Sequence, residues 1–143
     1  MRITKTPTAV TPRYIDNASA GILLYVDPAK EYEIQPDQAC NLPTGICVEI
    51  PRNCFGAIYP QGNLHKKGLI FTDTIQIISS SYRGEIVLSV RNILSTVLQI
   101  NGLLGLRTPL AQLIIQPYKF EKIDVVEELG IPYNWFIQPP NNH

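Results

Sequence analysis

The sequence lacks the residue patterns that mark disulfide-bonded or zinc-binding proteins. Its three cysteines, Cys40, Cys47 and Cys54, include no Cys-x-x-Cys pair, so neither a disulfide framework nor a zinc site is expected. The two histidines are His65 and the last residue, His143, which leaves no basis for a histidine-centred catalytic triad. We expect the cysteines to be free, buried thiols in a reducing compartment.

An excess of charge and long apolar runs are also missing. Twelve basic and twelve acidic residues give a formal net charge of zero, so nucleic acid is not expected as a partner. No apolar run reaches the roughly 18 residues of a transmembrane helix, and the N-terminal sequence MRITKTPTAVTPRYIDN has no apolar core of a secretory signal. We therefore expect an intracellular protein, in the cytoplasm or nucleus, without a membrane partner. An apolar content of 45% without net charge indicates that other subunits cover part of the surface.

The sequence does contain many short apolar segments separated by turns. Twelve prolines and nine glycines divide segments rich in Ile, Val, Leu and Tyr, which favours an all-β sandwich or barrel in one domain over residues 1–143. Residues 1–16 are predicted to form an N-terminal arm, and residues 130–143 an aromatic, proline-rich tail. Strands are predicted over residues 21–26, 32–34, 39–42, 46–50, 55–59, 74–78, 85–90, 96–100 and 110–116.

Residues 85–106 are harder to assign because their apolar spacing also fits a helix. β-branched residues dominate the first part of the segment, and Asn92 and Gly102 interrupt a helical run. We therefore predict two strands that are joined by a turn near Arg91 and Asn92. One short helix is predicted over residues 123–129, where DVVEEL is followed by a glycine as a C-terminal stop.

Five short segments, taken in chain order, resemble the motifs of the homotrimeric dUTPase family. They are Ser19-Ala20-Gly21 with Leu24-Tyr25, Leu42-Pro43-Thr44-Gly45-Ile46 with Glu49-Ile50-Pro51, Ser81-Tyr82-Arg83-Gly84-Glu85-Ile86, Ala111-Gln112-Leu113-Ile114, and Val125-Val126-Glu127-Glu128-Leu129. The resemblance covers residues 17–129 in the family's order. It implies a dUTPase-like jelly roll or β-barrel, a homotrimer with sites between subunits, and hydrolysis of dUTP to dUMP and pyrophosphate assisted by magnesium.

Other residues occupy the positions at which the family places its acids. Leu23 stands where the first motif has an aspartate near the metal, and Ser79 stands where the third motif has the aspartate that orients the attacking water. A leucine cannot hold a metal-bound water, and a serine hydroxyl alone is not a useful base near pH 7. The resemblance therefore implies a vacant catalytic site with no metal and no cofactor, magnesium being expected only in an active protein. Asp73 lies near Ser79 in the sequence. In an active protein, it is the acid that would take over the role of the missing base.

The motifs that contact the nucleotide are altered. The second motif reads PQGNL, in which Gln61 replaces a cation and Gly62 replaces a hydroxyl; Gly62 and Asn63 remain nucleotide-binding candidates. Tyr82 matches the family residue that packs against the deoxyribose, and Gln112 matches one that contacts the nucleotide near its phosphates. Each also has a structural interpretation, Tyr82 as the cap of a tight hairpin and Gln112 as a partner for strand backbone groups.

The C-terminal part departs most from the family pattern. No glycine-rich fifth motif follows Leu129, and Arg107-Thr108-Pro109 replaces the usual Gly-Asp-Arg ahead of the fourth motif. The tail instead contains Tyr133, Trp135 and Phe136. These are candidate interface residues because aromatic side chains are favoured anchors at interfaces, with packing on their own domain as the alternative.

Three functions are compatible with these residues. The leading hypothesis is a dUTPase-like protein, of viral origin by this resemblance, that has lost its catalytic motifs and acts as a homotrimeric protein-interaction or structural module with an unidentified protein partner. The second is a nucleotide-binding protein without hydrolysis, which would use Tyr82 and Gln112. The third is a divergent but active dUTP diphosphatase, which would use Asp73.

Overall fold

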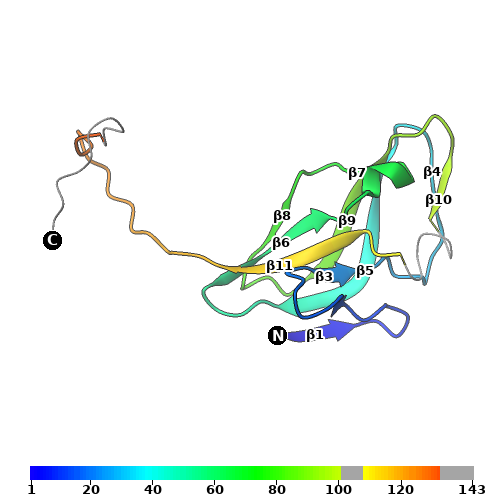
Figure 1. The fold of residues 1–143 in the computed structure, drawn as a ribbon, viewed down its shortest axis with the longest axis horizontal. Helices are drawn as coiled ribbons and strands as arrows, with labels where there is room; N and C mark the ends of the chain where they lie inside the picture. The colour runs from blue at the N-terminus through cyan, green and yellow to red at the C-terminus, as the bar shows by residue number, and fades with distance from the viewer. Residues whose placement is uncertain (101–107, 133–143) are drawn as a thin grey trace.

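In the residues that it describes, 1–100 and 108–132, the computed structural model is an antiparallel β structure with a single short 3₁₀ helix. One sheet has four strands in the order β1 (Arg2–Lys5), β5 (Ala39–Glu49), β9 (Glu85–Asn92) and β7 (Leu69–Phe71). The other has five strands in the order β2 (Arg13–Tyr14), β3 (Ile22–Leu24), β11 (Ala111–Pro117), β6 (Cys54–Pro60) and β8 (Gln76–Ile78). A separate ladder joins β4 (Tyr32–Ile34) to β10 (Leu98–Ile100), and the 3₁₀ helix η1 (Leu64–Lys67) precedes β7 (Figure 1). This is the predicted all-β jelly roll, and no helix among these residues is long and apolar enough to cross a membrane.

The hydrophobic core takes side chains from both large sheets, and β9 shows how the sequence builds it. Burial alternates along β9, with Ile86, Leu88 and Val90 buried and the residues between them half-buried. Alternation with a period of two is the pattern of a strand, because successive side chains point to opposite faces. The predicted strand is therefore confirmed over the alternative helix, but it extends through Arg91 and Asn92, where the turn was predicted, and the chain bends only at residues 94–96.

The Pro-Thr-Gly segment forms a bulge in the middle of β5. The pairing of β5 with β9 shifts its register between Pro43 and Cys47. Gly45, within the bulge, has a φ of +71°, a conformation that L side chains rarely adopt. The buried Thr44 hydroxyl donates to the backbone oxygen of Ile86 at 2.7 Å and so satisfies a carbonyl beside the irregularity.

Asp27 ties the N-terminal segment to the body of the fold. Its buried carboxylate accepts hydrogen bonds from the hydroxyls of Thr8 at 2.6 Å and Thr6 at 2.8 Å, and from the Ala29 N–H at 3.1 Å. Burial by itself raises the pKa of Asp27, but the three hydrogen bonds to its charged form outweigh burial and hold the pKa below its ordinary value. The ionised carboxylate therefore stabilises the fold.

We expect Asp27→Asn to lower the free energy of unfolding by about 2 kcal/mol at pH 7, because the amide replaces an acceptor that receives two hydroxyl hydrogen bonds. Since the folded-state pKa is depressed, this stabilisation is present above the unfolded pKa of about 3.9 and is lost as the pH falls through the folded value. Urea unfolding at pH 7, 5 and 3 should show that the difference in free energy of unfolding between the natural sequence and Asp27→Asn becomes smaller as the pH falls. Asp37→Asn is the control, because the Asp37 carboxylate is exposed, and a gap that stays constant with pH would contradict the role of Asp27.

The predicted N-terminal arm, residues 1–16, includes two short strands. Residues 1–16 contribute β1 to one sheet and β2 to the other, and neither these strands nor β7 was predicted from the sequence. These strands are short and pair through backbone groups that every non-proline residue offers, so their side chains carry little signal. Residues 39–42 and 46–50, predicted as two strands, are one strand bent by its bulge and ending at Glu49.

The cysteines are free thiols, as predicted, but they are half-buried rather than buried. Cys40 and Cys54 pack against the edge of the core. Partial burial raises the pKa of the Cys40 thiol, because it disfavours the thiolate.

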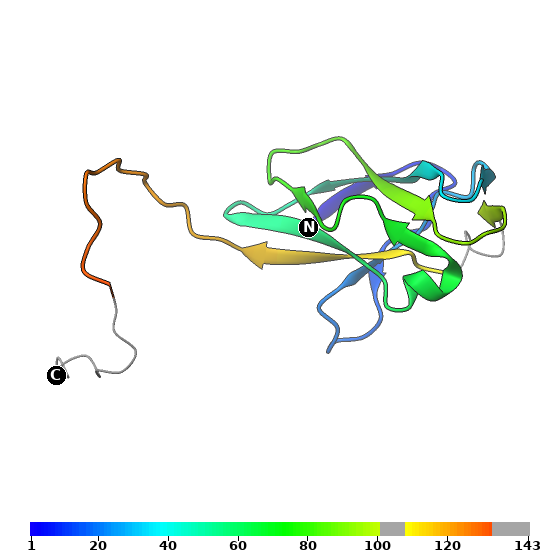
Figure 2. The same cartoon turned by 90° about the horizontal axis from the view of Figure 1, so that it is seen from above.

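After β11 the chain leaves the sheets as an extended segment, which Figures 1 and 2 show from two directions. The predicted helix over residues 123–129 is wrong, because these residues form no helix. A single short helix without packing partners is marginal in water. Most apolar side chains along the segment are almost fully exposed, including Val125 at 97% and Leu129 at 90%, whereas Val126 is 57% exposed. Such a segment requires another surface to cover it.

Candidate functional site

A cavity of about 640 Å³ opens beside the connection between β8 and β9. Three predicted site residues line it: Asp73 ahead of β8, Ser79 directly after β8, and Tyr82 in the turn that follows. The volume lies within the range of small-molecule sites. The third-motif segment thus forms a concave surface on the scale of a nucleoside.

Tyr82 closes the turn and also faces the cavity. Its N–H donates to the backbone oxygen of Ser79 at 3.1 Å, and its hydroxyl donates to the backbone oxygen of Glu85 at 3.0 Å. A methyl group added at Gly84 would lie 2.5 Å from the Tyr82 hydroxyl oxygen, so the ring end rests against this glycine. Tyr82 remains 42% exposed, which leaves ring surface for a ligand. The structure therefore accommodates both its capping role and its predicted binding role.

Ser79 has its hydroxyl engaged within its own turn. The Ser79 Oγ lies 2.9 Å from the Oγ of Ser81 and accepts the Ser81 N–H at 3.2 Å. A small polar side chain that bonds to the backbone two residues later stabilises a turn. Ser79, which the resemblance places at the family's base position, thus serves the local structure of the turn.

Two acidic residues line the cavity, Asp73 and Glu85. Among the described residues, no hydrogen bond connects the Asp73 carboxylate to Ser79 or Tyr82. Glu85 was not singled out in the sequence, although it belongs to the segment that resembles the third motif. Gln76, also missed, donates from Nε2 to the backbone oxygen of Val87 at 3.0 Å and braces the cavity wall. No local signal could have identified it, because Ile75 and Ile77 on either side are exposed while Gln76 is half-buried on the same face of β8 as Ile78.

The first and fourth motifs meet on neighbouring strands away from this cavity. Leu23 on β3 pairs with Gln112 on β11. A methyl group at Gly21 would lie 2.2 Å from Oε1 of Gln112, so the glycine makes room for that side chain. Gln112 does not line the cavity that contains Tyr82. Within one chain, the two retained family positions therefore lie in different places.

The second motif lies next to the fourth. The Gln61 N–H donates to the backbone oxygen of Leu110 at 3.0 Å. With Gly62 and Asn63, Gln61 lines a smaller cavity of about 280 Å³ beside η1. The Oε1 atom of Gln61 is buried and has no hydrogen-bond partner among the described residues. Asn63 has a φ of +69° and precedes η1, so a structural role for it is evident.

The side chains of this region do not fit a magnesium ion held by the protein. Within the described residues, no group of three or more His, Cys, Asp and Glu side chains lies in a position to bind a metal. Leu23, which the resemblance places at the family's first acid position, is 4% exposed and carries no oxygen donor, whereas magnesium prefers oxygen ligands. The predicted interface residues Tyr133, Trp135 and Phe136 lie outside the described residues, so their role stays a prediction.

Comparison with known proteins assigns this architecture. The family model described as dUTPase matches residues 8–132. A Caldanaerobacter subterraneus subsp. tengcongensis protein named deoxyuridine 5'-triphosphate nucleotidohydrolase is 35% identical over 120 residues, covering 83% of this chain and 78% of that protein. A protein of the same name from Wigglesworthia glossinidia brevipalpis is 29% identical over 134 residues, covering 86% and 85%. The one from Escherichia phage T5 is 33% identical over 97 residues, covering 67% of this chain and only 63% of the phage protein.

Solved structures agree with the fold. The dUTPase of Staphylococcus bacteriophage 80alpha superimposes with a TM-score of 0.79 at 17% identity, covering 91% of this chain and 97% of that one. The dUTPase of phage phi11 of S. aureus gives 0.78 at 19% identity, covering 90% and 96%. The two packed sheets, with a cavity at the third-motif turn, define the jelly-roll class to which dUTPases belong. The chain is a member of the dUTPase family.

Proposed function

We propose that this chain is a dUTPase-family protein that does not hydrolyse dUTP and acts through protein–protein contacts. One observation carries the proposal: the family's two acid positions hold a buried leucine, Leu23, and a serine, Ser79, whose hydroxyl is bonded within its own turn. Attack of water on a triphosphate requires a base in the correct orientation and cations that neutralise the phosphate oxygens. Neither position supplies an acid for these tasks.

The test is a pyrophosphate-release assay with dUTP and magnesium, in which we expect no turnover above the buffer background. Enzymes accelerate such reactions by about a million-fold or more, so the outcome is unambiguous against an active family member as positive control. The variant Asp73→Asn tests the remaining alternative, in which Asp73 acts as the catalytic base. Turnover by the natural sequence that disappears in Asp73→Asn would replace this proposal with a divergent dUTP diphosphatase, an alternative supported by the place of Asp73 on the cavity wall.

Nucleotide binding without hydrolysis is the second candidate, and the cavity at Tyr82 favours it. If the ring packs on a sugar, we expect Tyr82→Ala to weaken nucleotide binding at least tenfold, whereas Tyr82→Phe keeps the ring and most of the affinity. Calorimetry against a panel of deoxynucleotides and cyclic nucleotides measures this. If the natural sequence binds no member of the panel detectably, this candidate is rejected. A protein that acts through protein–protein contacts then remains as the proposed function.

Assembly into a homotrimer is part of the proposal. Tyr82 and Gln112 line no common cavity within the described chain, so a site that contains both requires two subunits. The exposed apolar side chains of the C-terminal segment require a covering surface, which a neighbouring subunit would provide. Light scattering should give about three times the chain mass of 16.0 kDa, and a monomeric mass would contradict this assembly. An intracellular location and a viral origin remain predictions.

A further inference from the structure

A second cavity, of about 580 Å³, lies on the other side of the turn that carries Tyr82. Ser80, Ser81 and Arg83 of that turn line this cavity, whereas Ser79 and Tyr82 line the one described above. The turn thus separates two cavities that share no lining residue.

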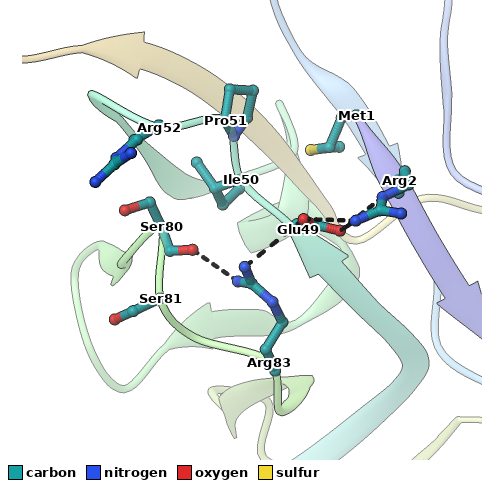
Figure 3. A pocket seen from close by; sticks show the side chains of 9 residues that line it. All are labelled: Met1, Arg2, Glu49, Ile50, Pro51, Arg52, Ser80, Ser81 and Arg83. Atoms are coloured by element: carbon teal, nitrogen blue, oxygen red, sulfur yellow. Dashed lines mark hydrogen bonds and ion pairs between the residues drawn. The ribbon is translucent and has the colours of Figure 1, made fainter.

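Three arginines and one glutamate surround this cavity. Arg2 makes a two-pronged pair with Glu49, from Nε to Oε2 at 2.8 Å and from Nη2 to Oε1 at 2.9 Å. Arg83 also approaches Glu49, with Nη2 lying 3.8 Å from Oε1. Figure 3 shows this row of charges, with Arg52 on the opposite side of the view from Arg2. Three guanidinium groups therefore face a single carboxylate, which leaves a surplus of two positive side-chain charges, and the α-ammonium of Met1, which also lines the cavity, adds a further positive charge.

The structure holds Arg83 in place but leaves Arg52 without a partner. Arg83 Nη1 donates to the backbone oxygens of Ser80 at 2.6 Å and Tyr82 at 3.1 Å, which orients the guanidinium at the cavity wall. Arg52 makes no hydrogen bond or ion pair among the described residues. Between them, the Ser80 and Ser81 side chains bring hydroxyl groups to the same cavity (Figure 3).

We propose that this arginine cavity, lined by Arg2, Arg52 and Arg83 with Ser80 and Ser81, binds a phosphoryl group. A phosphate monoester carries a charge of about −1.5 to −2 near pH 7 and so offsets most of this positive charge, whereas a carboxylate offsets much less of it. Guanidinium groups bind phosphate oxygens in a fixed fork, and the Ser80 hydroxyl can donate to a remaining oxygen, whereas the Ser81 hydroxyl is bonded to Ser79 Oγ. The site does not depend on hydrolysis or on nucleoside binding, because no Tyr82-cavity residue takes part.

The test is an NMR titration with inorganic phosphate at pH 7.5, with chloride added to constant ionic strength. Because Arg2 and Arg83 are exposed, we expect a dissociation constant on the order of 1 mM, with saturable shifts of the Ser80, Ser81 and Arg83 amides. Arg52→Gln, which breaks no existing bond, should weaken binding at least fivefold. Lys66→Gln removes an exposed charge outside the cavity and should titrate like the natural sequence.

A parallel titration with dUMP distinguishes the source of the phosphoryl group. Binding at least tenfold tighter than phosphate, weakened by Arg52→Gln, would indicate a nucleotide, whereas equal or weaker binding would indicate free phosphate or a smaller ester. Shifts that chloride reproduces, or equal affinities of Arg52→Gln and the natural sequence in both titrations, would overturn the proposal. The dUTP assay and the Tyr82 variants are unaffected by that result, so the two proposals fail separately.

Discussion

Replacing Gly45 by alanine is expected to destabilise the protein by about 3 kcal/mol. A residue with a side chain costs about 1–2 kcal/mol at positive φ, and Gly45 has a φ of +71°. Its new methyl group would also lie 2.6 Å from Thr6 Oγ1, 2.7 Å from Asp27 Oδ2 and 2.8 Å from Ala9 Cβ. Real side chains avoid such distances, so the hydrogen bonds of Asp27 would have to shift.

Urea unfolding at one fixed protein concentration measures this effect, because the stability of an oligomer depends on concentration. Gly62→Ala is the matched control, since no atom lies within 4 Å of a methyl group built there. We expect it to change the free energy of unfolding by less than about 0.5 kcal/mol. Equal effects at the two glycines would show that neither the positive φ of Gly45 nor its close neighbours require a glycine in the bulge of β5.

Replacing Asn92 by alanine should cost a similar amount, about 3 kcal/mol. Asn92 is fully buried, and its Nδ2 donates to the backbone oxygens of Ile34 and Thr96, each at 2.9 Å. Its Oδ1 accepts the Leu94 N–H at 2.8 Å. Alanine would leave these groups without partners, and an unsatisfied buried polar group costs about 1–3 kcal/mol.

Asn41→Ala provides the comparison, because the more exposed Asn41 accepts only one hydroxyl hydrogen bond, from Ser89 at 2.7 Å. We expect it to cost less than about 1 kcal/mol, since water replaces the lost partner. Thermal and urea unfolding of both variants measure the difference. If Asn92→Ala unfolds at the same urea concentration as the natural sequence, Asn92 does not hold the turn after β9 together.

The strands were the most predictable part of the fold. The β-branched residues at the start of residues 85–106 predicted β9, and the strand forms with one face packed in the core. The edge strands β1 and β2 were missed because their residues are mostly exposed and pair through the backbone. The helix predicted over residues 123–129 failed for a different reason: helix formers alone do not fold a short segment that has nothing to pack against.

The candidate site was predictable as a set of motifs and not as a set of distances. Tyr82, Ser79 and Asp73 are close in sequence, and the structure places all three around one cavity. Gln112 lies far from Leu23 and Gly21 in the sequence. Only the pairing of β11 with β3 brings it beside these two residues. The arginine cavity had no signal at all, because Arg2, Arg52 and Arg83 are far apart in the chain.

The sequence by itself determined the family and the all-β class, because these depend on residue identity and local order, and it predicts that Leu23 and Ser79 replace the family's acids. Tertiary structure alone decided that Ser79 bonds within its turn, that Gly45 must accommodate Asp27, and that three distant arginines face one carboxylate. The physical reason is that hydrogen bonds, close packing and charge surplus depend on distances of a few ångströms between segments. Those distances are set by how the two sheets pair, which no local pattern in the chain encodes.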